Sequence, residues 1–218
     1  MITNLLINVL RLFIVLFISI FVHELGHLIS ALICRVKIEA FSIGFWKILW
    51  HKKIKGIDFR LSLLPLGGYV KLAGETDKRP NGLLSQRYLK KIFIILSGVL
   101  MNFLLACLCY KIGYDSIAVG IRIDLTILKA IIFKEVAPLS LILNLTKAQF
   151  FLIQLSLINL ASAITNILPL PALDGGMIWM AWIEKLTPNY EKVIKRLSIY
   201  GFIFALLLQL IGIIYILT

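Results

Sequence analysis

The chain has 218 residues, enough for one domain of ordinary size, and its hydrophobic share of 60% exceeds the roughly 45 to 50% of a soluble domain. Only 16% of its residues are charged and its mean hydropathy is +0.96, which excludes a disordered chain and a water-soluble globule. Three cysteines are too few for a disulfide scaffold, and a net charge of +12 raises the question of where the basic residues lie. The composition predicts a single all-α polytopic membrane domain over residues 1–218.

Four apolar runs predict transmembrane helices, at residues 12–34, 92–110, 150–168 and 197–218. The last three contain no formal charge, whereas the first contains two histidines and a glutamate. Ionisable side chains at membrane depth are energetically unfavourable and usually mark function. The first run is also too long for the apolar part of a cleavable signal peptide, and it lacks a basic region ahead of it.

Lysine and arginine are distributed unevenly between the two sides that these segments define. Seventeen lie after the first and third segments, and six lie on the opposite side. The positive-inside rule therefore predicts that both termini face outward and that the more basic side is cytoplasmic. This placement largely explains the basic charge without a nucleic-acid partner.

Residues 38–72, between the first two segments, predict a β-hairpin on the cytoplasmic side. Apolar residues alternate in two runs, which a basic tip at residues 51–56 separates. The aromatic content, including Trp46 and Trp50, suits a hairpin that re-enters the membrane interface. An ordinary cytoplasmic hairpin is the alternative.

The stretch 111–148, between the second and third segments, contains a second alternating pattern. Apolar residues occupy every other position from Ile117 to Ile127, which predicts a β-strand on the outward side. The sequence indicates no role for this stretch.

A metal-binding motif lies within the first apolar segment. Residues 23–27 read His-Glu-Leu-Gly-His and fit H-E-x-x-H. On a helix, His23 and His27 project from one face, where both can reach a single zinc ion. Glu24 can then act as general base for the attacking water. The alternative is a pair of buried histidines that line a pore or a proton path.

A catalytic zinc usually takes three protein ligands, and Asp174 is the remaining candidate for the third. His51 lies in the basic hairpin tip, and the other apolar segments offer only amide side chains, which bind zinc poorly. Asp174 directly follows the third segment, where two prolines interrupt the helix before a glycine turn. Because the first and third segments run in the same direction, the three side chains are expected to meet near the cytoplasmic face. A plain Asp-Gly turn is the alternative.

With these motifs the chain resembles the site-2 protease family of intramembrane zinc metalloproteases, and specifically its bacterial regulator-of-sigma-E branch. Four stretches carry the resemblance: His23–His27, Pro65–Lys71, Ser97–Asn102 and Asn166–Gly176. There are two departures from the pattern. Val99 stands where the family often has proline, and the loop 111–148 is too short for the PDZ domains typical of that branch.

The resemblance implies a zinc endopeptidase of the bacterial inner membrane. Its zinc ligands would be His23, His27 and Asp174, and its catalytic base Glu24. Its expected substrates are transmembrane segments of single-pass membrane proteins or remnant signal peptides. Membrane lipid is its other expected partner, and no nucleic acid is expected.

The resemblance also implies residues that contact the substrate. Asn102 and Asn166 match family asparagines near the active site. The hairpin, with Gly67, Gly68 and Tyr69, would present the substrate as an extended strand, a known mode of peptide recognition.

Two other functions are compatible with intramembrane histidines and carboxylates. A metal or proton carrier would use the same residue types, although neither the paired repeats nor the polar path across the whole bilayer that transporters commonly show is visible in the sequence. A helix-binding scaffold without activity would not need the intact H-E-x-x-H motif and Asp174. Cys107 and Cys109 are expected to be packing residues and not ligands.

Overall fold

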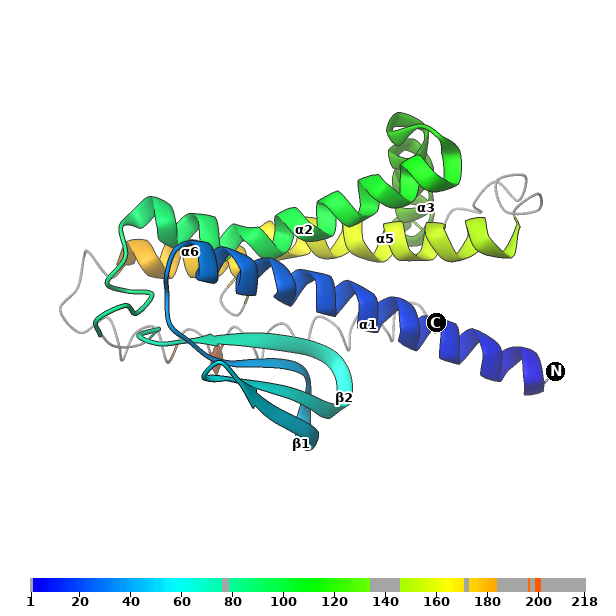
Figure 1. The fold of residues 1–218 in the computed structure, drawn as a ribbon. Helices are drawn as coiled ribbons and strands as arrows, with labels where there is room; N and C mark the ends of the chain where they lie inside the picture. The colour runs from blue at the N-terminus through cyan, green and yellow to red at the C-terminus, as the bar shows by residue number, and fades with distance from the viewer. Residues whose placement is uncertain are drawn as a thin grey trace.

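A computed structural model describes residues 2–75, 79–133, 146–170, 173–183, 196 and 199–200 of the chain. Its elements are α1 (Ile2–Ile33), β1 (Ile38–Ile54), β2 (Ile57–Leu72), α2 (Tyr88–Tyr114), α3 (Ile117–Phe133), α5 (Lys147–Ile167) and α6 (Asp174–Ile183). Figure 1 shows α1, α2 and α5 as long helices, with the β-hairpin folded along one side of α1. The fourth predicted segment, 197–218, lies outside the described residues except for residues 199 and 200.

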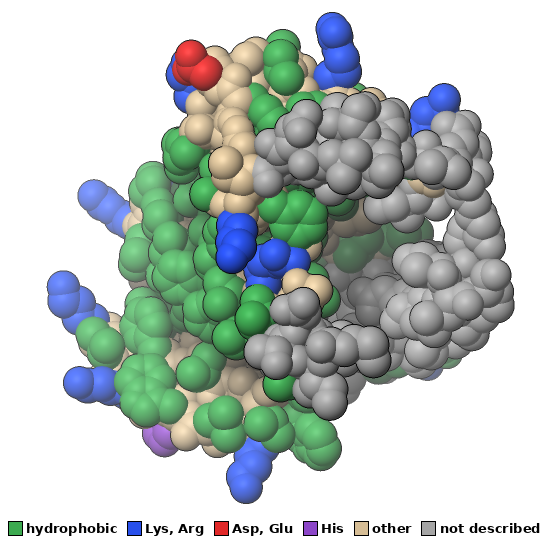
Figure 2. Space-filling view, turned by 90° about the vertical axis from the view of Figure 1, so that its right-hand side faces the viewer, with side chains coloured by type: hydrophobic (Ala, Val, Ile, Leu, Met, Phe, Trp, Pro, Cys, Tyr) green, Lys and Arg blue, Asp and Glu red, His purple; other side chains and the backbone are tan. Residues whose placement is uncertain are grey.

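Three of the described helices are long and apolar enough to cross a membrane: Leu6–Ile33, Tyr88–Tyr114 and Lys147–Ile167. Each contains most of one of the first three predicted segments. Large apolar side chains such as Leu10 and Leu104 are exposed along them, as a lipid-facing surface requires. In Figure 2, hydrophobic side chains cover much of the described surface, and most of the lysines and arginines in view project from its edge. The chain is therefore a multi-pass membrane protein.

The relative directions of the three long helices follow from their shared apolar clusters. Val15 of α1 packs with Cys109 and Leu155 at one end, while Leu28 and Ile94 share a core cluster at the other. Helix α2 therefore runs opposite to α1. Figure 1 shows that α5 runs in the same direction as α1. The ends of α1 and α5 consequently lie at the same end of the bundle. Cys109 is buried in this packing, as expected.

The hairpin covers the predicted range, residues 38–72, and closes with a two-residue loop. Ile54 pairs with Ile57 across Lys55 and Gly56, whose φ angles are 49° and 86°. Two consecutive positive φ values define a type I′ turn, which matches the twist of antiparallel strands.

Strand β1 bends sharply after its first part, because Gly44 and Trp46 have φ angles of 86° and 73°. The bend lets the first part of β1 pair with two parts of β2: Phe41 lies opposite both Val70 and Phe59. The sheet is therefore compact and irregular.

The part of the hairpin that reaches furthest toward the start of α1 is the bend in β1, and not the basic tip. Ile38 belongs to the cluster that contains Leu28, whereas the Phe41 ring packs edge-on against Phe21, 6.1 Å away, so the strand runs back toward the start of α1. Beyond the bend the hairpin folds back toward the beginning of β1, because Asp58, next to the tip, pairs with Ala40. The basic tip thus lies level with the end of α1.

The prediction of a strand at residues 117–127 is wrong, because these residues form part of helix α3. The Ser116 hydroxyl accepts the Val119 N–H at its start, at 3.4 Å. Gly120 and Asp124, one turn apart, are both buried near Tyr110, whose hydroxyl donates to Asp124 Oδ2 at 2.7 Å. Packing at helical spacing has overridden a period-two pattern of apolar residues.

Candidate active site

The two histidines of the H-E-x-x-H motif lie on one face of α1, one turn apart. Their ring centroids are 4.8 Å apart with nearly perpendicular planes, and the two Nε2 atoms are separated by 3.2 Å. Both side chains are only 13% exposed. Two ring nitrogens therefore meet in a largely buried pocket.

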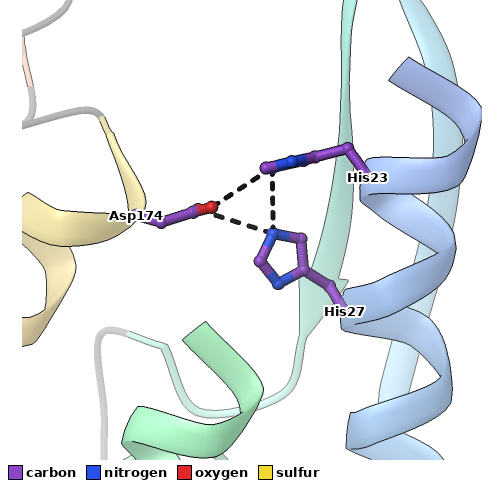
Figure 3. Close-up of side chains that lie close together, drawn as sticks. All are labelled: His23, His27 and Asp174. Carbon is purple, nitrogen blue, oxygen red and sulfur yellow. Dashed lines mark hydrogen bonds and ion pairs between the residues drawn. The ribbon is translucent and has the colours of Figure 1, made fainter. Parts of the chain in front are cut away.

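Asp174 completes this group from the other end of the sequence. Its Oδ2 lies 3.2 Å from His23 Nε2 and its Oδ1 lies 3.4 Å from His27 Nε2, as Figure 3 shows. Asp174 is the first residue of α6 and not part of a glycine turn, so the N-terminal dipole of that helix favours an ionised carboxylate there. The structure thus brings His23, His27 and Asp174 together.

The spacing of these donors fits a zinc ion. One atom from each of the three residues lies within 4.8 Å of the other two. Zinc bonds of about 2.0 to 2.1 Å at tetrahedral angles place neighbouring ligand atoms about 3.3 Å apart, close to the separations above. Asp174 Oδ2 is also buried without a hydrogen bond within the described residues. A metal ion would supply the partner that this oxygen lacks.

Gly98 of α2 leaves room on the side where the two Nε2 atoms point. A Cβ at this position would lie 2.8 Å from His23 Nε2 and closer still to His27 Nε2. Gly26 of α1 has a similar role between the helices, because a Cβ there would lie 2.8 Å from Met101 Cγ. The two glycines let α1 and α2 cross closely at the site.

The backbone of α2 determines which ring nitrogen of neutral His27 carries the hydrogen. Its Nδ1 lies 2.8 Å from the Ile94 carbonyl oxygen, which can only accept a hydrogen bond. In the neutral ring the hydrogen is therefore on Nδ1, and Nε2 keeps the lone pair that a metal requires. The Ser97 hydroxyl, which donates to the same carbonyl at 2.6 Å, also contacts Ser30 Oγ at 2.8 Å.

Glu24 lies between the histidines in sequence and faces the hairpin. It is only 7% exposed and lies within electrostatic range of His23, His27 and Asp174. A Cβ on Gly68 of β2 would lie 2.7 Å from Glu24 Cγ and 2.7 Å from the Ser42 carbonyl oxygen. The hairpin backbone thus forms one wall of the Glu24 pocket, and only glycine fits this position without a displacement.

We expect Gly68→Ala to reduce peptide cleavage on the order of 10²-fold without releasing zinc, because a Cβ would displace the Glu24 carboxylate by a fraction of an ångström or more. Cleavage rate and zinc content of the purified protein are measured together. Gly56→Asn, at the hairpin tip where a side chain meets nothing within 4 Å, is the control and should cleave normally. Normal cleavage by Gly68→Ala would show that Glu24 does not depend on this wall.

Of the remaining residues predicted for the site, Asn102 lies next to a histidine, whereas Asn166, Gly67 and Tyr69 have other neighbours. Asn102 is fully buried and its Nδ2 lies 3.3 Å from His23 Nδ1. Asn166 Nδ2 lies 3.5 Å from Ser162 Oγ, within its own helix. Gly67 borders the Phe45 ring, and the Tyr69 hydroxyl accepts a hydrogen bond from Arg60 at 3.1 Å.

Sequence reasoning missed two contributors to the site and correctly set one histidine aside. The carbonyl of Ile94 gives no sequence signal, whereas Gly98, a glycine in the middle of an apolar helix, was a visible signal for close approach. The His51 side chain is 69% exposed in the hairpin, near Asp58, and lies outside the donor group.

The fold and this donor set define a class of protein: a membrane protein in which two histidines of an H-E-x-x-H helix and a carboxylate from another helix form the donor arrangement typical of zinc metalloproteases. The family model of peptidase family M50 matches residues 11–208. The chain therefore belongs to peptidase family M50. This membership confirms the resemblance inferred from the four motifs and makes zinc the metal of the class.

Individual relatives agree with this assignment. A Helicobacter pylori (strain J99) protein named "Putative zinc metalloprotease" is 49% identical over 100 residues, which are 42% of this chain and 29% of that protein. A similarly named Campylobacter jejuni protein is also 49% identical over 100 residues, 43% of this chain and 27% of its own length. The regulator of sigma E protease of Haemophilus influenzae is 41% identical over 100 residues, 43% and 23% of the two chains. The chain thus covers less than a third of the length of these relatives.

Proposed function

We propose that this protein is an intramembrane zinc metalloendopeptidase that cuts within the transmembrane segments of single-pass membrane proteins or remnant signal peptides. The observation that carries the proposal is the meeting of His23 Nε2, His27 Nε2 and the Asp174 carboxylate beside Glu24. Three of these residues, His23, Glu24 and His27, lie in a helix long and apolar enough to span a membrane, which supports cleavage within the bilayer.

His23, His27 and Asp174 would hold the zinc ion. When bound, zinc supplies Lewis-acid chemistry, which polarises a peptide carbonyl and makes water a better nucleophile. Glu24 takes the proton of the attacking water and passes it to the leaving amine. Because the two imidazoles are neutral, the negative charges of Glu24 and Asp174 would together balance the charge of a divalent cation. This balance removes the free-energy cost of burying an unpaired charge.

The hairpin would hold the substrate in the conformation that cleavage needs. A peptide bond within a helix is shielded by its own hydrogen bonds, and an extended strand exposes it. The stretch Gly67–Leu72 runs past Glu24 through Gly68, so a substrate strand aligned with it would pass the site. We propose that Gly67, Gly68 and Tyr69 line this path and that Asn166, close in sequence to Asp174, contacts the substrate or the oxyanion.

The charge distribution supports the orientation that we propose for the protein in the membrane. Both termini would face outward from the bacterial inner membrane, and the site would lie near the cytoplasmic face, because the more basic side contains the hairpin and the end of α1. Substrates would then be cut near their cytoplasmic ends.

The test is cleavage by purified protein in detergent, with a panel that contains a single-pass membrane protein and a signal peptide. We expect cleavage that a zinc chelator abolishes and that added zinc restores, since the donor group is complete only with the metal. Metal analysis should give about one zinc per chain, as three ligands at one site require.

Zinc binding without cleavage of any member of the panel would contradict the protease function. Zinc or proton flux into proteoliposomes that contain the protein would then favour the carrier function, and association with a membrane helix without flux would favour the scaffold.

A further inference from the structure

Asn102 is a fully buried amide on α2, one helical turn after Gly98. Its Nδ2 lies 3.3 Å from His23 Nδ1, and its Oδ1 is buried without a hydrogen-bond partner within the described residues. Buried side-chain oxygens nearly always have a partner, so an unpaired one next to a functional ring needs an explanation.

The chemistry of His23 requires the opposite orientation of this amide. Its Nε2 faces Asp174 and His27, which makes Nε2 the ligand atom. A neutral imidazole has one N–H, so a free Nε2 places the hydrogen on Nδ1, where it needs an acceptor. An amide NH₂ group facing Nδ1 would instead favour the tautomer whose Nε2 carries the hydrogen and cannot bind metal.

A half-turn of the Asn102 amide resolves both problems at once. The oxygen and nitrogen ends are alike in shape, so their assignment follows from the hydrogen-bond network. With Oδ1 toward His23, the unpaired oxygen accepts the Nδ1–H. His27 shows the same arrangement, because its Nδ1 lies 2.8 Å from the Ile94 carbonyl, which can only accept.

We propose that Asn102 is a positioning residue that accepts the Nδ1–H of His23 through its amide oxygen and thereby holds the tautomer that binds zinc. The inference rests on the proposed zinc site and deepens it. It gives Asn102 a role in metal binding and not in substrate contact, in agreement with its complete burial.

The test is zinc affinity, measured by competition with a chelator of known affinity, for Asn102→Leu and Asn102→Asp. Leucine has a similar size but no acceptor, and we expect it to weaken zinc binding about 10- to 100-fold, as loss of such partners does. Aspartate retains an oxygen acceptor and should bind zinc about as well as the wild type.

Asn159→Leu is the matched control. Asn159 is also fully buried, and its Nδ2 donates to Ser19 Oγ at 2.8 Å and to the Leu155 carbonyl at 2.7 Å instead of facing a histidine. Its replacement should lower thermal stability and leave zinc affinity unchanged. The comparison separates a general loss of packing from loss of the His23 partner.

The inference would be overturned if Asn102→Leu bound zinc with wild-type affinity. It would also be overturned if zinc affinity fell equally in Asn102→Leu, Asn102→Asp and Asn159→Leu. Neither outcome would contradict zinc binding by the wild-type protein. If the wild-type chain bound no zinc at all, the proposed function would fail at its first step, which the same titration detects independently.

Discussion

Glu24→Gln is expected to abolish peptide cleavage while zinc stays bound. Glutamine keeps the size of the side chain in its pocket against Gly68 but cannot take a proton from water. Loss of a general base lowers the rate by about 10²- to 10⁴-fold. His23, His27 and Asp174 are unchanged in this variant, so metal analysis should still give a full complement of zinc.

Glu39→Gln is the matched control for this substitution. Glu39 lies in β1, in the hairpin that also contains Gly68; it is partly exposed and pairs with Lys71 at 2.9 Å. A surface ion pair of this kind contributes little, so cleavage and zinc content should both remain normal. Cleavage by Glu24→Gln at a rate near that of the wild type would assign the base to another group.

Gly98→Ala is expected to remove both zinc and activity with a single added methyl group. That methyl would lie 2.8 Å from His23 Nε2 and against His27 Nε2, in the space that a metal would occupy between the donors. Alanine is otherwise the better helix former by about 1 kcal/mol, so the helix itself should not suffer. Zinc content and cleavage of the purified variant are measured together with its thermal stability.

Gly113→Ala, in the same helix, is the control, because a Cβ there meets Leu152 at ordinary distances of 3.5 and 3.7 Å. It should keep zinc, cleavage and stability. If Gly98→Ala also kept a full complement of zinc, the histidines would have moved aside, and the space at Gly98 would not be needed for the metal.

The sequence predicted the meeting of His23, His27 and Asp174 better than it predicted the structure of residues 117–127. An H-E-x-x-H motif specifies its own geometry, since residues four apart on a helix share a face. Asp174 could be found by elimination because few ligand types occur in the apolar segments. The strand prediction at residues 117–127 is wrong because an alternating apolar pattern is compatible with either structure. The contacts of Gly120 and Asp124 with Tyr110 favour the helix.

Other parts of the site depend on packing that no local pattern encodes. The Ile94 carbonyl becomes a partner of His27 only because α1 and α2 cross closely, and the Gly68 wall depends on the bend at Gly44 and Trp46. The hairpin range was predictable from its alternating residues and basic tip, but the return of the tip toward Ala40 was not. Sequence thus specifies the reactive groups more readily than the supports that orient them.

The origin of the donors in distant parts of the chain also bears on its synthesis. Helix α1 supplies two nitrogens as soon as it enters the membrane, but the Asp174 carboxylate begins α6 and arrives only after α5. Chains are made and inserted from the N-terminus, so a partly synthesised copy holds only part of this donor group. Under the proposed function, the nascent protein would therefore be unable to cut neighbouring membrane helices until Asp174 has been synthesised.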